Sequence, residues 1–310
     1  MSVLVLYLLF VVIFSFKVIR SDPYLNELGS ENNKFMEKIV EEQPEITIFT
    51  TGDVMLGRTV MIKAYERENY LFPFEKVADE MRDADITFFN LENPVMENCP
   101  YHSSGYTFCA RSKMLDGLVF SGVDVVNLAN NHILNYGNKG FEETRQHLGE
   151  RNILATGTGE LIIIERRGVV FGFLGFDKAQ QTNPKLTQAE IDLVRGSDMQ
   201  VDVLIVSMHW GVEYQDKALP GVRTLAKEIV GYGADLIVGH HPHWVQDWEF
   251  INGKPVFYSL GNFIFDQMWS EETKKGLAVK LTYDEDGNLA DYELLPTYMS
   301  SWSQPEFVED

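Results

Sequence analysis

Short apolar stretches in this chain stop abruptly at residues that bind metal ions or transfer protons, and this happens five times. Apolar runs rich in β-branched residues are typical of strands buried on both faces of a parallel sheet. Because ligands bind just beyond the carboxyl ends of such strands, we expect the polar residues to meet along one edge. The runs are 46–51, 86–89, 123–128, 203–208 and 236–238.

The side chains that follow these runs offer oxygen and nitrogen atoms, which suit a hard or borderline divalent cation. Asp53 and Glu92 follow the first two runs. A carboxylate after so apolar a strand is costly to bury unless it is paired or coordinates a cation. For Asp53, capping a following helix is an equally good alternative. The other candidate ligands are Asn131, His209, His240, His241 and His243.

Segment 239–243 holds three of the seven histidines. Residues two positions apart in extended chain face the same side, so His241 and His243 can point toward one site. Spacing alone leaves open which two of the three histidines bind. His132 follows two asparagines at another strand end, where it is placed to protonate a leaving group.

Further residues are expected to contact the substrate. Arg58 lies five residues after Asp53, and its planar guanidinium suits an anionic group; a surface ion pair is the alternative. The expected pocket wall consists of Asn130, Trp210, Glu213 and Asn262. Glu213 has two alternatives, either orienting His209 or acting as an ordinary surface acid.

Helical patterns alternate with the apolar runs, at 76–81, 113–121, 140–150, 188–199 and 221–231. This βαβ rhythm predicts an α/β fold with a largely parallel sheet and helices packed on it. Hairpin turns interrupt the rhythm at 166–168, 251–254 and 284–288. Antiparallel hairpins within a βα frame predict two packed sheets with helices outside.

The ends of the chain have their own character. Residues 3–16 are apolar except for Ser15, and the stretch extended through Ile19 is just long enough to span a bilayer, which takes about 17 residues or more. We expect a signal anchor or signal peptide at 1–20, with a buried core helix as the alternative. An acidic tether at 21–45, a folded domain at 46–298 and a loosely ordered polar tail at 299–310 complete the expected division.

Charge and cysteines constrain partners and location. The net charge of −20 argues against a nucleic-acid partner, and it means that an anionic substrate needs locally supplied positive charge. Cys99 and Cys109, the only cysteines, predict a loop disulfide in an exported domain; two free thiols are the alternative. The positive residues after the apolar segment would by themselves favour a cytoplasmic body.

Six sequence blocks occur in a fixed order: 52–58, 90–92, 128–132, 209–211, 239–243 with Gln246, and 258–263. Together they resemble the capsule-synthesis CapA family, also described as the poly-γ-glutamate synthesis family. That family is related to calcineurin-like metallophosphatases, which implies a four-layer αββα sandwich with mixed sheets and a two-metal site. The implied ligands are Asp53, Glu92, Asn131, His209 and two of the histidines in 239–243, with His132 as proton donor.

Two positions depart from the metallophosphatase pattern. Met55 stands where a histidine ligand is usual, and Glu92 stands where an aspartate usually bridges the metals. We therefore expect one or two divalent ions, with manganese, zinc, iron and magnesium as candidates.

The expected function is that of a membrane-anchored, extracytoplasmic, metal-dependent hydrolase of capsule or poly-γ-glutamate biogenesis, acting on an anionic polymer or a phosphoester. The alternative is a non-catalytic, metal-stabilised binding component that works with polymer synthase or export subunits. The departure at Met55 favours this alternative to some degree.

Overall fold

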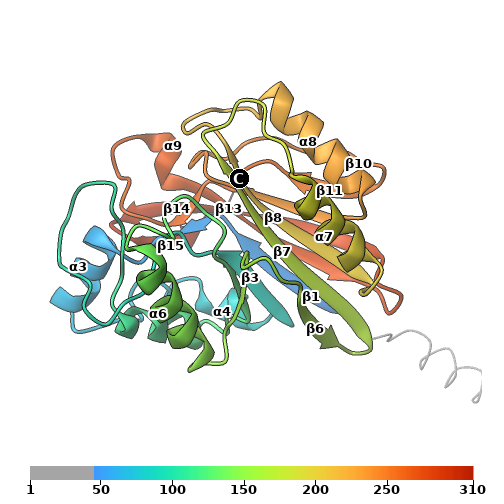
Figure 1. Ribbon diagram of the computed structural model, residues 1–310. Coiled ribbons are helices and arrows are strands. Elements are labelled where there is room, and N and C mark those ends of the chain that lie inside the picture. Colours follow the sequence, from blue (N-terminus) through green and yellow to red (C-terminus); the bar gives the residue numbers. More distant parts are fainter. Residues whose placement is uncertain (1–44, 310) are drawn as a thin grey trace, which may run out of the picture. The chain divides into compact units, whose positions relative to one another are not determined.

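Two sheets face one another and helices cover both outer faces in the computed structural model of the protein (Figure 1), which describes residues 45–309. This four-layer αββα arrangement with mixed sheets confirms the predicted fold class. The signal anchor or signal peptide expected at 1–20, and the tether up to residue 44, lie outside the described residues. Within 45–309, no helix is long and apolar enough to cross a membrane.

The first sheet combines a parallel half with an antiparallel half. Its strand order is β15 (Gln304–Phe307), β14 (Leu289–Ser301), β13 (Lys275–Tyr283), β1 (Ile46–Thr51), β3 (Ile86–Asn90), β4 (Val125–Asn127) and β5 (Leu154–Thr156). Strands β1, β3, β4 and β5 run parallel, and β13 to β15 pair antiparallel. The helices of its outer layer are α3 (Arg58–Glu66), α4 (Ala78–Arg82), η1 (Ser112–Leu115), α5 (Asp116–Phe120) and α6 (Gly137–Gly149).

The second sheet has a parallel centre and antiparallel outer strands. Its order is β10 (Trp248–Ile251), β11 (Lys254–Phe257), β9 (Leu236–His240), β8 (Val203–Gly211), β7 (Val169–Ala179) and β6 (Ile162–Arg166). Helices α7 (Gln188–Asp198) and α8 (Pro220–Gly231) cover its outer face (Figure 1). Thr187 and Glu190 form a capping box that starts α7.

Three apolar cores lie between the four layers. Neighbouring side chains of a strand point to opposite faces of a sheet, so Phe88 of β3 packs between the sheets while Phe89 packs under the first helical layer. Phe88 meets Phe173 of β7 across the sheet interface, with ring centroids 5.3 Å apart. These strands are buried on both faces, which explains their continuous apolar runs.

The three predicted hairpins are confirmed as β6–β7, β10–β11 and β13–β14. The expected loose tail at 299–310 is wrong for most of its length. Strand β14 continues to Ser301, β15 pairs with it, and the Phe307 ring packs edge-on against Phe49 at 6.4 Å. Burial of an aromatic ring against the outer core holds this polar segment as an edge strand.

A short third sheet positions the start of the site. Strand β2 (Asp53–Val54) pairs in parallel with β12 (Asn262–Ile264), which is followed by α9 (Glu271–Lys274). Helix α3 begins at Arg58 with Gly57 as its N-cap residue and no side-chain cap. The alternative role of Asp53 as a helix cap is therefore wrong.

Candidate metal centre

Two close backbone contacts bring the strand ends together. A Cβ atom on Gly52, between β1 and β2, would lie 2.2 Å from the carbonyl oxygen of Gly261. A Cβ atom on Gly239 in β9 would meet another backbone carbonyl oxygen at 2.1 Å. Only glycine allows such approaches. They place Asp53 directly opposite Asn262 in the β2–β12 pair.

Glu92, just after β3, lies at the centre of the cluster. Its Oε1 atom is 3.8 Å from His132 Nε2, 3.9 Å from His209 Nε2 and 3.8 Å from His243 Nε2. The carboxylate is fully buried, and neither of its oxygens has a hydrogen-bond partner within residues 45–309. Buried polar atoms in native proteins are nearly always partnered, so these oxygens indicate a bound cation.

Asp53 is buried beside Glu92 but is well supplied with donors. Its Oδ1 accepts a hydrogen bond from Asn90 Nδ2 at 2.8 Å, and its Oδ2 accepts one from the backbone N–H of His241 at 3.1 Å. Nδ1 of His240 lies 3.3 Å from Oδ1, and Nδ1 of His243 lies 3.5 Å from Oδ2. Asp53 therefore carries its charge in a site already arranged to stabilise an anion.

The two carboxyl groups differ in acidity. Burial, together with the nearby charge of Asp53, raises the pKa of Glu92 well above its ordinary value. Burial alone would raise the pKa of Asp53 as well, but His240 and His243 hold that pKa well below its ordinary value. A divalent ion would favour the ionised form of both carboxyl groups.

His209 and His241 present neutral imidazoles, which is the form that binds metals. Burial lowers the pKa of His209 well below its ordinary value and lowers that of His241 to about 3. Both ring nitrogens of His241 are buried without a partner among the described residues. His243 Nδ1 lies 3.0 Å from Asn262 Oδ1, and because an amide oxygen only accepts, Nδ1 carries the proton and Nε2 is left free to bind.

Ligand atoms gather in overlapping sets, each within 4.8 Å: Glu92 with His209 and His241, Asp53 with Glu92 and His243, and Glu213 with His241 and His243. The first two sets share Glu92, an arrangement that suits one or two ions. Of the three clustered histidines, His240 is in none of these sets, and its Nδ1 faces Asp53 Oδ1. Asn131 joins the site through its Oδ1, 2.9 Å from His209 Nε2.

The turn after β9 holds its histidines in a strained backbone. His241 has φ +94° and His243 has φ +59°, a region that residues with a Cβ atom rarely adopt. Such strain persists where the surroundings fix it, and it clusters at binding and active sites. The strain turns both rings toward the site, with centroids 6.0 Å apart.

His132 faces Glu92 from the end of β4. Its Nδ1 lies 3.0 Å from Asn135 Oδ1, which also accepts a hydrogen bond from the Phe108 N–H at 2.6 Å. The imidazole stacks on the Phe108 ring at 3.9 Å. Burial lowers the pKa of His132 to about 4, so the free site holds it neutral, with Nε2 directed at the cluster.

Asn90, the last residue of β3, forms side-chain hydrogen bonds to three neighbouring segments of the cluster. Its Oδ1 accepts hydrogen bonds from Asn127 Nδ2 and Asn130 Nδ2, and its Nδ2 donates to Asp53. It therefore ties the ends of β2, β3 and β4 together.

Of the expected substrate wall, Trp210 faces away from the cluster, whereas substrate contact by Asn130, Glu213 and Asn262 stays a prediction. Trp210 is fully buried under α8 and donates from Nε1 to the Tyr258 carbonyl at 2.9 Å. It follows His209 in β8, so it points to the opposite face of the sheet. Asn130 and Asn262 are buried too, and their hydrogen bonds position the His132 loop and the His243 ring.

Arg58 is occupied by the protein itself. Its guanidinium pairs with Asp266, donates to the Gly105 carbonyl at 2.8 Å and lies over the Phe108 ring at 4.4 Å. These contacts neutralise its charge and bear out the alternative of an ion pair, in a mostly buried form. Its gripping of an anionic substrate group stays a prediction.

Glu213 lies with His241 and His243, and Gln180 Nε2 donates to its Oε1 at 3.2 Å. Within residues 45–309, its contacts place it beside these two histidines. The alternative in which it orients His209 is not supported by them.

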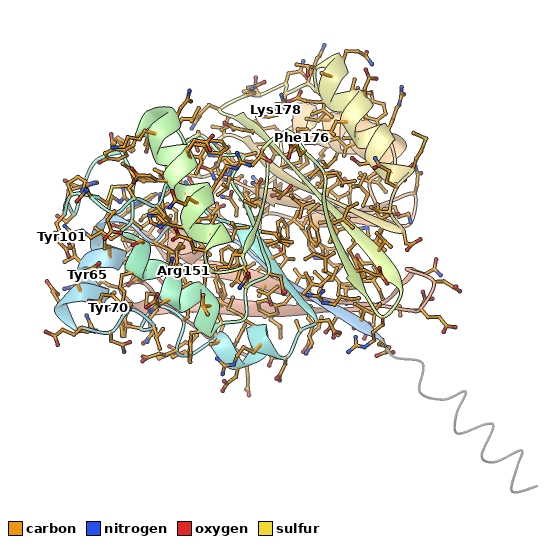
Figure 2. All side chains as sticks on the ribbon, turned by 60° about the horizontal axis from the view of Figure 1, so that its bottom comes forward. Tyr65, Tyr70, Tyr101, Arg151, Phe176 and Lys178 are labelled. Atoms are coloured by element: carbon orange, nitrogen blue, oxygen red, sulfur yellow. A yellow bond between two sulfur atoms is a disulfide. The ribbon has the colours of Figure 1, made fainter. Side chains whose placement is uncertain are left out.

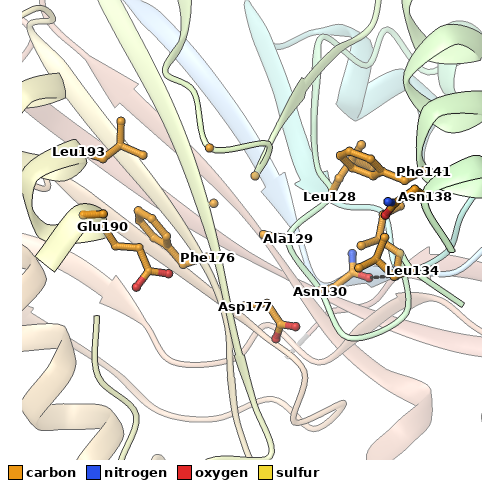
Figure 3. A pocket seen from close by; sticks show the side chains of 15 residues that line it. Leu128, Ala129, Asn130, Leu134, Asn138, Phe141, Phe176, Asp177, Glu190 and Leu193 are labelled. Carbon is orange, nitrogen blue, oxygen red and sulfur yellow. Dashed lines mark hydrogen bonds between the residues drawn. The ribbon is translucent and has the colours of Figure 1, made fainter. Parts of the chain in front are cut away.

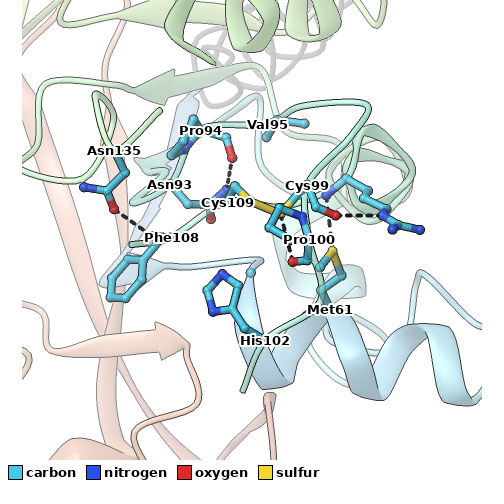
Figure 4. Close-up of a disulfide and its surroundings, with 12 residues drawn as sticks. Met61, Asn93, Pro94, Val95, Cys99, Pro100, His102, Phe108, Cys109 and Asn135 are labelled. Atoms are coloured by element: carbon cyan, nitrogen blue, oxygen red, sulfur yellow. Dashed lines mark hydrogen bonds between the residues drawn. A yellow bond between two sulfur atoms is a disulfide. The ribbon is translucent and has the colours of Figure 1, made fainter. Parts of the chain in front are cut away.

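A disulfide joins Cys99 and Cys109, as predicted (Figure 4). Arg111 Nε donates to the Cys99 carbonyl at 3.0 Å and fixes the base of the loop. Tyr101 at the start of the loop packs edge-on against Tyr65 of α3, with centroids 5.4 Å apart (Figure 2). The loop thereby presents a fixed wall beside the cluster.

Two cavities flank the strand ends. One of 310 Å³ opens beside Arg58 and the disulfide loop. A larger one of 790 Å³ lies between α6 and α7, with Asn130, Phe176 and Asp177 among its lining residues (Figure 3). The carboxylate and imidazole groups around Glu92 lie outside the lining of the larger cavity.

Residues 47–267 match the family described as bacterial capsule synthesis protein PGA_cap. The chain belongs to this family. The capsule biosynthesis protein CapA of Bacillus anthracis is 30% identical over 272 residues, which cover 79% of this chain and 66% of that protein. The PGA biosynthesis protein CapA of Bacillus subtilis (strain 168) is 31% identical over 250 residues, which cover 73% and 65%. The chain thus spans just under two thirds of the length of these relatives.

The fold of this PGA_cap chain resembles that of a solved phosphatase from Mycoplasma pneumoniae, with a TM-score of 0.51 at 15% identity over 82% of this chain and 94% of the other. The likeness shows a shared metallophosphatase-type fold.

The structure shows what Met55 does in place of binding a metal ion. Its side chain is buried in the outer core, and its sulfur accepts a hydrogen bond from the Gly57 N–H at 3.0 Å. Met55 is therefore part of the core and not of the ligand cluster.

Proposed function

We propose that this PGA_cap-family protein is a divalent-metal-dependent hydrolase of capsule or poly-γ-glutamate biosynthesis, acting outside the cytoplasm on a phosphoester or on a bond within an anionic polymer. One observation carries the proposal above all. The buried Glu92 carboxylate has neither of its oxygens hydrogen-bonded within residues 45–309, and three imidazoles face it.

The donor set fits a divalent ion of the manganese, zinc, iron or magnesium type. Asp53, Glu92, His209, His241 and His243 would hold it, because they combine carboxylate oxygens with imidazole nitrogens. When bound, the ion supplies electrophilic polarisation of a substrate oxygen and activation of water.

His132 supplies the proton transfer in this proposal. Its Nδ1–H is held by Asn135 Oδ1, so its Nε2 is the atom that faces the reacting groups. An anionic substrate group beside Nε2 raises the pKa of His132, because an opposite charge favours the imidazolium form. His132 would then take up a proton from solvent at Nε2 and give it to the leaving-group oxygen or nitrogen as the bond to that atom breaks.

Hydrolysis by the full chain tests the proposal. We would measure bound metal after purification, then turnover of bis-p-nitrophenyl phosphate and of poly-γ-glutamate with added manganese or zinc. His132→Ala should lower turnover at least about a hundredfold while metal content is kept. His147→Ala, which changes a partly buried histidine on α6 that pairs with Glu150, serves as the matched control. Equal turnover by wild type and His132→Ala would remove the proposed acid.

The second candidate is a non-catalytic, metal-stabilised component of a polymer synthesis or export complex. The missing ligand at Met55 favours it. In that case the protein would bind metal with the same residues, neither substrate would turn over, and synthase or export subunits would co-purify with it.

The extracytoplasmic location rests on the Cys99–Cys109 disulfide and on the apolar start of the sequence, which we propose to be a membrane anchor or a signal peptide. Free-thiol titration of protein isolated from cells should find no thiols. Two free thiols per chain would contradict this location.

A further inference from the structure

Aromatic side chains gather around the 310 Å³ cavity beside the metal centre. Tyr106 comes from the disulfide loop, Tyr214 from the loop after β8, Trp269 from the segment after β12, and Trp302 from the β14–β15 turn. Trp269 is 60% exposed and Trp302 is 46% exposed. Large apolar side chains grouped in the open mark a binding surface.

The cavity is connected to the metal centre. The Tyr214 ring lies 6.0 Å from the His243 ring, and the Tyr214 N–H donates to the Pro242 carbonyl at 2.8 Å. A hydrogen-bonded path also runs from Tyr214 through Gln267 and Asn262 to the same His243. A ligand in the cavity would therefore lie next to groups held by the cluster.

The cavity offers no free positive charge. Arg58 is the sole lysine or arginine among its described lining residues, and Asp266 neutralises it. The chain as a whole carries a net charge of −20. A polyanion therefore gains little here, even though the neighbouring cluster can receive one anionic group through its metal.

The remaining polar groups suit hydroxyls. Asp266 and Gln267 line the cavity but already bond to groups of the fold. The hydroxyls of Ser103 and Ser104 line the same cavity as the aromatic rings. They provide both donors and acceptors, while the rings offer flat apolar faces with polar tips. A ligand that matches this mixture has apolar ring faces and a hydroxyl-rich edge.

We propose that this cavity is a saccharide subsite, in which a sugar ring stacks on Trp302 while its hydroxyls bond to the polar groups of the lining. This inference rests on the proposed function in one respect: the sugar ring would lie beside the bond that is hydrolysed. Binding of the sugar does not depend on hydrolysis. A nucleobase stacked on the same rings, or a glutamate oligomer, are the competing occupants.

Titration of the full chain with neutral tetrasaccharides tests the subsite. We would add maltotetraose, cellotetraose and chitotetraose, and follow tryptophan fluorescence and heat. At least one should bind saturably to wild type. Trp302→Ala should weaken that binding about fivefold, from the roughly 1 kcal/mol that an aromatic contact contributes, whereas Trp302→Phe should keep most of it. Phe250→Ala, an exposed aromatic on β10, should bind as wild type does.

Adenosine and tetra-γ-glutamate form the other arms. Saturable binding of either in place of the sugars would overturn the proposal, as would an absence of saturation by all three sugars or equal binding by wild type and Trp302→Ala. Glu92→Gln should lose hydrolysis and keep sugar binding. A failed hydrolysis assay therefore leaves the subsite standing, and a failed titration leaves the hydrolase standing.

Discussion

Two buried carboxylates at the same edge of the molecule differ in their partners. Asp266 pairs with Arg58 and also accepts a hydrogen bond from the Thr59 N–H at 3.1 Å. Glu92 is fully buried, yet both its oxygens lack hydrogen-bond partners within the described chain. A buried carboxylate that is paired within the protein stabilises the fold. One whose oxygens have no partner within the protein is available to bind a ligand. Substitution of Glu92 should therefore mainly lower activity, whereas substitution of Asp266 should mainly lower stability.

The largest effect is expected at Glu92. Glu92→Gln keeps the shape and removes the charge that binds the cation, so turnover should fall about a thousandfold, or about 4 kcal/mol of transition-state stabilisation. Added manganese at a hundred times its Kd should stabilise wild type by about 2.7 kcal/mol and the variant by much less. Asp124→Asn, at the opposite end of β4 and bonded to Thr87 N–H and Arg166, is the control that should keep full turnover.

The pH dependence of stability in the metal-free protein gives a second test of Glu92→Gln. The raised pKa of Glu92 means that the folded state binds its proton more tightly than the unfolded state does. The resulting stability is complete below the unfolded pKa of about 4.3 and is lost as the pH rises toward the folded pKa. Glu92→Gln lacks this loss, so its melting temperature should gain on that of wild type from pH 5 to pH 8. Parallel pH curves would show that Glu92 is partnered after all.

Asp266→Ala should instead destabilise the fold. It leaves the mostly buried Arg58 guanidinium without its counter-charge, which costs about 3 kcal/mol, or roughly 6–10 °C in melting temperature. Asp247→Ala breaks a more exposed Arg–Asp pair with Arg223, which keeps Glu249 as a partner, and should cost at most about 1 kcal/mol. Equal losses in the two variants would contradict the comparison.

The sequence predicted the part of the site that depends on strand ends. Asp53, Glu92, His209 and His243 meet because parallel strands of both large sheets direct their carboxyl ends toward the same place between the sheets. The sequence could not show the partner of Arg58, because Asp266 is 208 residues away and only the fold joins them. Trp210 was predictable in principle, since it neighbours His209 in a strand and must face the other way.

The end of the chain shows a different limit. Strand β15 has little apolar pattern of its own, and it forms because β14 offers an open edge and the Phe307 ring finds Phe49. Edge strands of this kind depend on long-range pairing more than on local preference. The short β2–β12 pair that aligns Asp53 with Asn262 arises in the same way.

The disulfide loop contacts both the Arg58–Asp266 pair and the histidine that faces Glu92. Reduction of the disulfide should therefore have an effect of intermediate size. Its loop carries Gly105, which holds Arg58, and Phe108, which stacks on His132. Breaking the bond with dithiothreitol, or by a Cys99→Ser/Cys109→Ser double substitution, should cost about 2–3 kcal/mol and lower turnover. Dithiothreitol applied to the double variant is the control and should change nothing further. Unaltered melting and turnover on reduction would mean that the loop holds its shape without the bond.

The smallest effect is expected at Asn135, whose side-chain oxygen connects His132 to the disulfide loop. Asn135 Oδ1 accepts hydrogen bonds from both His132 Nδ1 and the Phe108 N–H. Asn135→Ala frees the imidazole to rotate, and the loss of an orienting partner of this kind lowers turnover about tenfold. The fall should be in kcat with little change in KM, because Asn135 aims the proton donor and does not touch the substrate. Asn135→Asp retains an acceptor and should recover most of the rate, whereas Asn138→Ala, in the neighbouring turn of α6, should match wild type. If Asn135→Ala were as active as Asn138→Ala, the orientation of His132 would have to come from Phe108 alone.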